Sequence, residues 1–179
     1  MELPGDEERD GWIEIHDLDA LAEADDKVRE CRYFLSLIER ERNWHCFRWL
    51  TSAFLGAAYS FFEIQALGAF FSFYHPETGD PIENDEALTV LRRYVAVVQD
   101  AKRPSYVKTK GVHPVTEVLY NMRRGNTHHY PLTIRPPSES APEEFQFGGT
   151  KERGRPVLQF CREVLALIED VNQQLEKVI

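Results

Sequence analysis

Apolar residues recur every three or four positions in five segments of the chain, and this spacing predicts five helices. The segments run from Asp17 or Asp19 to about 42, and then over about 44–71, 83–101, 114–125 and 156–178. Asn43 suits the cap of the second helix, and Pro114 suits the first turn of the fourth. The pattern predicts an all-α fold built as a five-helix bundle.

The second predicted helix carries almost no charge. Within 49–74 the only formal charge is Glu63, and this stretch is long enough to span a bilayer. A carboxylate in mid-segment is costly in lipid, so we interpret the stretch as the central helix of a soluble bundle, with no membrane partner. Ser52, Gly56 and Ser60 lie four apart and form a strip of small residues. Such a strip allows a second helix to approach closely, within the fold or across a dimer.

The connections carry turn-forming or alternating residues. The stretch "YHPETGDPIEND" reads as a turn-rich connection, and "KRPSYVKTKGV" as a basic loop in which Pro104 ends the third helix. The short alternating runs "LTIR" and "FQFG" predict a small β-hairpin or a long loop at about 131–150. The positions predicted to face inward on the third helix are Leu88, Leu91, Val95 and Val98.

Length and cysteine usage change this picture little. Residues 1–16 are acidic and are predicted to form a flexible tail, while 17–179 suit a single domain. The N-terminal stretch lacks the apolar region of a signal peptide. Cys31, Cys46 and Cys161 are far apart with no CxxC pair, which argues against zinc ribbons and thioredoxin-type chemistry. We therefore predict reduced thiols and a cytoplasmic location.

Motifs for cofactors and metals are lacking in the sequence. It contains no glycine-rich phosphate loop, no GxSxG and no HExxH. A ferritin-like centre needs two Glu-x-x-His sets, which the chain does not have. The sequence therefore predicts neither a metal nor a cofactor.

Charge is shared unevenly along the chain, whose net charge is −9. Between Arg92 and Arg135 nine Lys or Arg residues face two acids, so this span has a net charge of +7. The remainder has twelve basic and twenty-eight acidic residues, a net charge of −16. A local positive surface on an acidic body suits phosphate recognition, because the field near the ligand matters more than the total. The alternative is a solvated face whose arginines sit at a helix C-terminus.

The stretch "MRRGNTHHYP", residues 122–131, gathers titratable groups inside the basic span. Arg123 and His128 are five apart, a spacing that places them on different faces of a continuous helix. We expect Gly125 to end the helix, so that the chain folds back and brings a histidine beside an arginine. Histidine can move protons at neutral pH, and arginine can stabilise an anionic phosphorus. These are the groups that metal-free RNA cleavage requires.

These residues resemble the signature of HEPN-domain proteins, helical bundles that carry Arg, four to six residues, and then His. In "RRGNTH", four residues separate Arg123 from His128. The motif is also matched by Arg124 and His129, with four residues between them, and by Arg123 and His129, with five. The helix "NWHCFRWLTSAFLGAAYSFF" is similar to the family's central helix. The resemblance implies a dimeric, metal-independent ribonuclease, often a toxin or defence component paired with an antitoxin. The HEPN family also includes noncatalytic members that bind nucleotides, RNA or protein partners.

Our leading interpretation is a HEPN-like bundle and homodimer that binds RNA at the 123–129 turn and cleaves it. Arg123 would hold phosphate, His128 would act as base or acid, and His129 would support or replace it. The alternative is a noncatalytic interaction module whose basic patch, 92–135, docks an acidic partner protein. Further residues expected to contact RNA or phosphate are Arg124, Asn126, Lys102, Arg103, Lys108 and Lys110.

Overall fold

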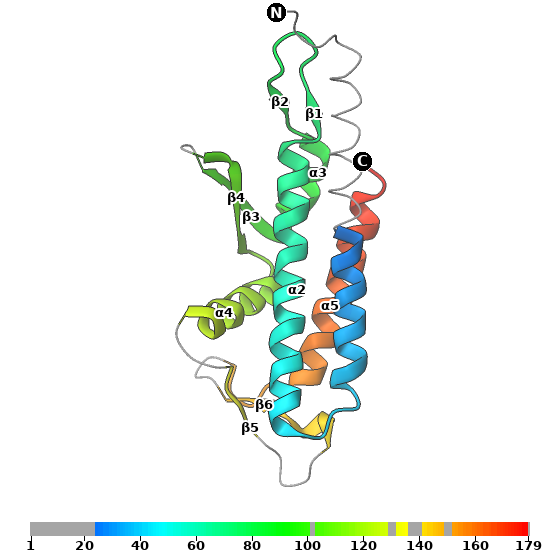
Figure 1. The fold of residues 1–179 in the computed structure, drawn as a ribbon, viewed down its shortest axis with the longest axis vertical. Coiled ribbons are helices and arrows are strands. Elements are labelled where there is room, and N and C mark those ends of the chain that lie inside the picture. The colour runs from blue at the N-terminus through cyan, green and yellow to red at the C-terminus, as the bar shows by residue number, and fades with distance from the viewer. Residues whose placement is uncertain (1–23, 101–102, 129–131, 136–140, 149–151, 179) are drawn as a thin grey trace, which may run out of the picture.

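The computed structural model describes residues 24–100, 103–128, 132–135, 141–148 and 152–178 and shows a mostly α-helical fold (Figure 1). Five helices lie in these ranges: residues 24–38, α2 (Trp44–Phe70), α3 (Asp85–Leu91), α4 (Pro114–His128) and α5 (Val157–Leu175). A short 3-10 helix, η1, covers Pro142–Glu144. Three two-stranded antiparallel sheets join β1 (Phe73–Tyr74) to β2 (Pro81–Ile82), β3 (Val95–Asp100) to β4 (Arg103–Gly111), and β5 (Ile134–Arg135) to β6 (Gln146–Phe147).

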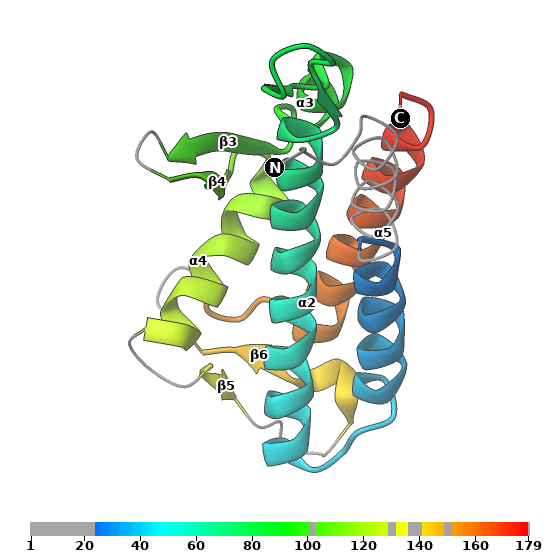
Figure 2. The same ribbon diagram turned by 45° about the horizontal axis from the view of Figure 1, so that its top comes forward.

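The long helix α2 is the centre of the fold. Its predicted cap is confirmed, because the Asn43 side chain accepts hydrogen bonds from the backbone N–H groups of His45 and Cys46. Helix 24–38 and α5 lie on one side of α2, whereas α4 and the β3–β4 hairpin lie on the other (Figures 1 and 2). Among the described residues α2 alone is long and apolar enough to cross a membrane, and 56 % of its most apolar stretch is buried in the fold.

Helix 24–38 is joined to α5 by charged pairs at its surface and by cysteines beneath. Arg32 bonds Glu169 at 2.7 Å, and Arg162 bonds Glu39 at 2.8 Å. Cys31 and Cys161 are fully buried and belong to the hydrophobic core. Burial, with a smaller contribution from Glu30, raises the pKa of Cys31 to about 12.

The third predicted helix is correct only in its first half. It ends at Leu91, and the chain continues as strand β3 instead of remaining helical to 101. Val98, expected to face inward, is 58 % exposed and pairs with Lys108 of β4. The valines of "VAVV" are compatible with a helical and with an alternating pattern. Hydrogen bonding to β4 stabilises the strand conformation. The predicted basic loop is therefore strand β4.

The connections that follow α2 and α4 contain the two smaller hairpins. The stretch predicted as a turn-rich connection closes as β1–β2, where the His75 N–H donates to the Asp80 carbonyl at 2.8 Å and Gly79 has a φ of 70°. The hairpin considered for "LTIR" and "FQFG" is confirmed, since Ile134 pairs with Phe147. Phe145, just before β6, stacks on Phe47 of α2 with ring centroids 4.1 Å apart.

Helix α4 starts as predicted, but it ends later. Pro114 is its first residue, and the His113 side chain caps it by accepting the Val115 N–H at 3.3 Å. The prediction that Gly125 ends the helix is wrong, because α4 continues to His128. An interior glycine costs a helix only about 1 kcal/mol, and α4 continues for three residues beyond Gly125 despite this cost.

Candidate functional site

Most of the described basic residues of the span 92–135 lie on elements at one side of α2. Strand β4, helix α4 and strand β5 carry six of these residues, and the three elements lie on the side of α2 opposite helix 24–38 (Figures 1 and 2). We define the α4–β4 face as Lys108, Lys110, Arg123 and Arg124; Arg123 is half-buried and the other three are exposed. The separation of charge in the sequence is therefore also a separation in space.

Strand β4 presents its lysines by simple alternation. Val107, Thr109 and Gly111 are buried, whereas Lys108 and Lys110 between them are exposed. Thr109 contacts α4, because its hydroxyl hydrogen-bonds with the hydroxyl of Tyr120. The two lysines therefore lie on the outward face of the β3–β4 hairpin.

Two tyrosines and an arginine connect α4 to α2. The Arg123 guanidinium lies over the Tyr59 ring, with Cζ 4.3 Å from the ring centroid. The rings of Tyr59 and Tyr120 are 4.6 Å apart between centroids. Burial, with smaller contributions from Tyr59 and Glu63, raises the pKa of Tyr120 above its usual range, so its phenol stays neutral. Arg123 thus holds a fixed position against aromatic rings.

The predicted fold-back of the 123–129 turn is wrong, because the helix continues through Gly125 and Asn126. Five residues of helix turn the chain by about 140° beyond one full turn, so Arg123 and position 128 lie on different faces. Position 128 instead lies one turn beyond Arg124, on the face that includes the exposed Glu117. The arginine paired with position 128 along the helix is therefore Arg124, not Arg123.

The structure describes five of the predicted site residues only in part or not at all. His129 and Lys102 lie outside the described residues. Asn126, His128 and Arg103 have described backbones in α4 and β4, and their side chains lie outside the described part of the chain.

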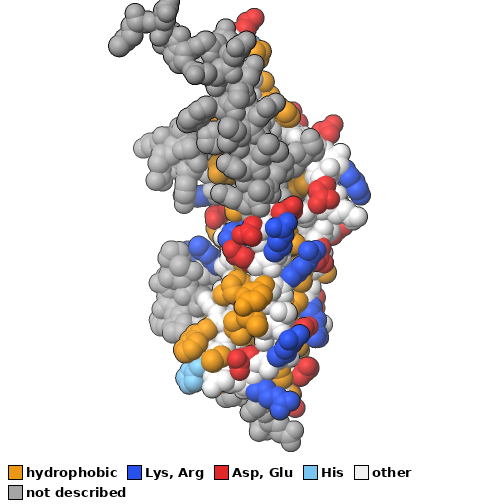
Figure 3. All heavy atoms as spheres, turned by 45° about the vertical axis from the view of Figure 1, so that its right-hand side comes forward, with side chains coloured by type: hydrophobic (Ala, Val, Ile, Leu, Met, Phe, Trp, Pro, Cys, Tyr) orange, Lys and Arg blue, Asp and Glu red, His pale blue; other side chains and the backbone are white. Residues whose placement is uncertain are grey.

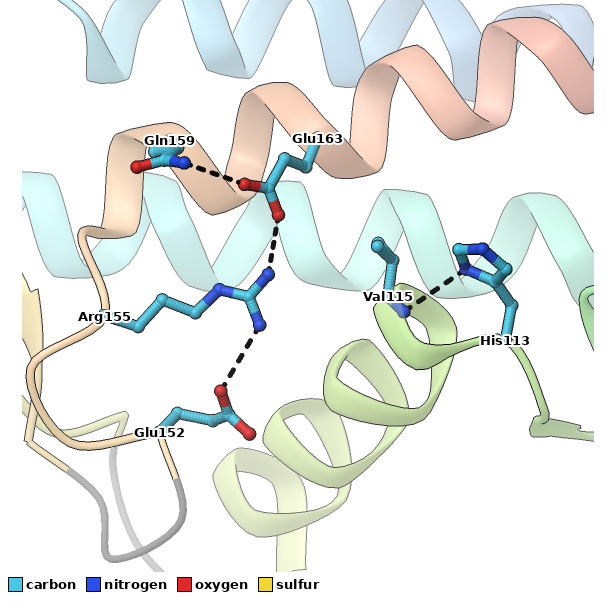
Figure 4. A network of polar contacts seen from close by, with 6 residues as sticks. All are labelled: His113, Val115, Glu152, Arg155, Gln159 and Glu163. Atoms are coloured by element: carbon cyan, nitrogen blue, oxygen red, sulfur yellow. Dashed lines mark hydrogen bonds and ion pairs between the residues drawn. The ribbon is translucent and has the colours of Figure 1, made fainter.

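A second charged cluster precedes α5 and is neutralised internally (Figure 4). Arg155 bonds Glu163 at 2.6 Å and Glu152 at 3.3 Å, and it lies over the Phe160 ring. Gln159 donates to the other oxygen of Glu163 at 3.0 Å. An arginine held between two carboxylates is a poor phosphate ligand, so this cluster fixes the loop to α5 and leaves the α4–β4 face as the candidate site.

Metal and thiol chemistry find little support in the described ranges. No three His, Cys, Asp or Glu side chains gather there as a metal ion would need. Burial also raises the pKa of Cys161 above its usual range, and the nearby Cys31 adds to this shift. A buried thiol that keeps its proton is a weak nucleophile.

Sequence reasoning missed Tyr59 and Tyr120. Tyr59 lies in an apolar helix, where nothing in the sequence sets it apart, and only the three-residue spacing from Tyr120 to Arg123 indicates a shared helix face. Comparison of the chain with family models, curated proteins and solved structures finds no match.

Proposed function

We propose that the chain is a HEPN-like homodimer whose α4–β4 face binds RNA and cleaves it without a metal ion, as toxin or defence ribonucleases do. The observation that carries the proposal is the gathering of Lys108, Lys110, Arg123 and Arg124 on one side of an acidic protein. Fixed positive charge of this kind attracts a polyphosphate backbone, while the acidic remainder limits indiscriminate binding.

The four residues have different tasks in this proposal. Lys108, Lys110 and Arg124 are exposed and meet phosphates. Arg123 is held on the Tyr59 ring and offers a flat cation on which an unpaired base can stack. The mixture of charge and aromatic surface suits single-stranded RNA.

Cleavage is assigned to Arg124 and His128, which occupy positions one helical turn apart on α4. A histidine removes the proton from a 2′-hydroxyl, and the arginine stabilises the anionic phosphorus formed by its attack. The leaving 5′-oxygen needs a second proton donor, which the neighbouring His129 or the histidine of a second copy supplies. A cyclic phosphate is the expected product.

Charge reversal on the face should weaken RNA binding selectively. We expect Lys110→Glu and Arg124→Glu each to weaken binding of a single-stranded RNA about tenfold at low salt, because each loses a phosphate contact and adds repulsion. Fluorescence anisotropy with a labelled 20-mer measures this effect. The matched control is Lys177→Glu, which makes the same charge change at an exposed residue beyond α5. Equal weakening by the control would contradict a local site.

RNA cleavage should depend on the histidines at the end of α4. We expect the full chain to release cyclic-phosphate fragments from a mixed RNA pool in EDTA, and His128→Ala/His129→Ala to lose at least about a hundredfold of this rate. His75→Ala, in the exposed β1–β2 hairpin, serves as the histidine control. If the RNA stays bound but intact, cleavage is contradicted and the chain is a noncatalytic RNA-binding protein.

An acidic partner protein is the second candidate for the same face. Val98 and Val112 are 58 % and 54 % exposed near the β4 lysines, and apolar side chains between charges are typical of protein interfaces. Val98→Ser separates the two functions, since it should leave RNA affinity unchanged and weaken a protein complex.

A further inference from the structure

The β1–β2 hairpin extends beyond the end of α2 and exposes apolar side chains there (Figure 1). Every residue from Phe73 to Glu83 is exposed. The large apolar ones, Phe73, Tyr74 and Ile82, are 52 %, 36 % and 42 % exposed. Figure 3 shows hydrophobic side chains with acidic ones beside them at the upper end of the molecule, where this hairpin lies. Exposed apolar side chains that gather within a polar rim are typical of an interaction site.

Two of these side chains form a pair on one face of the hairpin. Phe73 of β1 and Ile82 of β2 are opposite each other in the antiparallel register. Directly opposed residues point to the same face, with Cβ atoms about 5 Å apart. We define the hairpin surface as this apolar pair together with the exposed carboxylates of the same hairpin, Glu77, Asp80 and Glu83.

The turn of the hairpin is fixed by hydrogen bonds to His75. Its N–H donates to the Asp80 carbonyl, and its own carbonyl accepts the Gly79 N–H at 2.8 Å. Its Nδ1 accepts the N–H groups of Glu77 at 3.3 Å and Thr78 at 3.4 Å. The backbone that carries the two turn carboxylates therefore has one defined shape.

The base of the hairpin is joined to the rest of the fold. Asn84 lies just beyond β2 and is buried. It donates its N–H to the Ala69 carbonyl of α2 at 2.7 Å, and its side-chain amide donates to the Val178 carbonyl at 3.2 Å. The hairpin is thus anchored at the end of α2 while its apolar pair stays outside the core. An exposed element that is already held in one shape binds a partner at low entropic cost.

Charge on the hairpin surface selects the partner. The three carboxylates lie in a stretch without cations, since the chain contains no Lys or Arg between Arg48 and Arg92. An anionic surface repels RNA and acidic lipid headgroups, and it attracts Lys and Arg. Negative charge and exposed apolar side chains together therefore indicate a protein partner that offers both basic and apolar side chains.

We propose that the hairpin surface docks a basic amphipathic helix of a different protein. Such a helix has apolar residues in one line and Lys or Arg on both flanks, which matches an apolar pair beside carboxylates. Addition of a strand suits this hairpin less, because each strand has only two residues and Pro81 lacks an N–H. The surface lies on other elements than the α4–β4 face, so the inference does not depend on the proposed function.

A defined peptide tests the apolar pair. The probe is a labelled peptide of about fourteen leucines and lysines, with the leucines at helical spacing. Fluorescence anisotropy with the full chain at low salt should show saturable binding. Phe73→Ser and Ile82→Ser should each weaken it at least about tenfold, because each removes half of the apolar pair. Val112→Ser is the matched control: it removes a similarly exposed apolar side chain beyond β4 and should leave the affinity within about twofold.

Charge reversal tests the carboxylates. Glu77→Lys and Asp80→Lys should each weaken peptide binding about tenfold at low salt, and this effect should fade at high salt. The control is Glu117→Lys, which makes the same change at an exposed residue of α4 and should change the affinity less than about twofold. All of these side chains are exposed, so the melting temperatures should stay close to that of the parent.

Several outcomes would overturn the inference. They are absence of saturable binding, equal weakening by Val112→Ser or Glu117→Lys, and equal affinity for a peptide in which serine replaces every leucine. Binding of the full chain to phosphatidylglycerol vesicles that is lost in Phe73→Ser would show that the hairpin meets lipid instead. Self-association in sedimentation velocity that is lost in Phe73→Ser would show that it meets a second copy.

Discussion

Replacing Gly111 by alanine is expected to lower the free energy of unfolding by about 3 kcal/mol. Gly111 is the last residue of β4, and a Cβ there would overlap the backbone of Thr116 and Glu117 in the first turn of α4. Backbone atoms cannot move aside as a flexible side chain can, so α4 must shift away from β4. Urea unfolding followed by circular dichroism measures the loss.

The cost is expected to be high because the junction is tightly bonded. The Tyr94 carbonyl accepts three hydrogen bonds there, from the N–H groups of Val112 and His113 and from the Thr116 hydroxyl at 2.5 Å. The control is Gly68→Ala in α2, where a Cβ meets no described atom within 4 Å. That change should be neutral or stabilising by up to about 1 kcal/mol. Equal stability of the two variants would show that β4 and α4 are not in contact at Gly111.

Alkaline pH is expected to destabilise the protein through its buried thiols. The pKa of Cys31 is raised from 9.0 to about 12 in the fold, so above pH 9 the unfolded chain loses this proton while the folded chain keeps it. The stabilisation is complete below pH 9 and is lost as the pH rises toward 12. The free energy of unfolding should fall by as much as about 1.4 kcal/mol for each pH unit. Cys161, whose pKa is raised in the same direction, adds to the slope.

Two variants separate the loss of the thiol proton from the loss of packing: Cys31→Ala removes a titrating group, and Val164→Ala removes only apolar volume. Cys31→Ala should be less stable than the parent at pH 7 and should lose less stability between pH 9 and 10.5. Val164→Ala removes a buried apolar group one turn from Cys161 and should lower stability equally at both pH values. Parallel pH profiles for the parent and Cys31→Ala would contradict the role of the thiol.

Local signals predicted the helix starts well. Asn43 and Pro114 act through their own chemistry, a side-chain acceptor and a fixed φ, and both helices begin where these residues predict. The pairing of Ile134 with Phe147 also followed from alternation within a few residues. Such features need no knowledge of distant parts of the chain.

The errors arose where distant contacts decide the outcome. Val95 to Val98 suits a helix or a strand, and the choice depends on hydrogen bonds to Val107 and beyond. Gly125 could end a helix or lie within one, and α4 includes it. The predicted site therefore differs from the structure in two ways. Position 128 lies one turn from Arg124 instead of beside Arg123, and Arg123 lies over the ring of Tyr59. Tyr59 lies more than sixty residues earlier, which no spacing rule could reveal.

The pairing of helix 24–38 with α5 has a consequence for synthesis. Arg32 and its partner Glu169 are 137 residues apart, and Arg162 and Glu39 are 123 apart. At about 5–20 residues per second, roughly 6 to 25 seconds separate the emergence of the two helices from the ribosome. During that interval one flank of the apolar α2 is uncovered. The core is completed only after α5 has left the exit tunnel, and until then the nascent chain exposes apolar surface of the kind that chaperones bind.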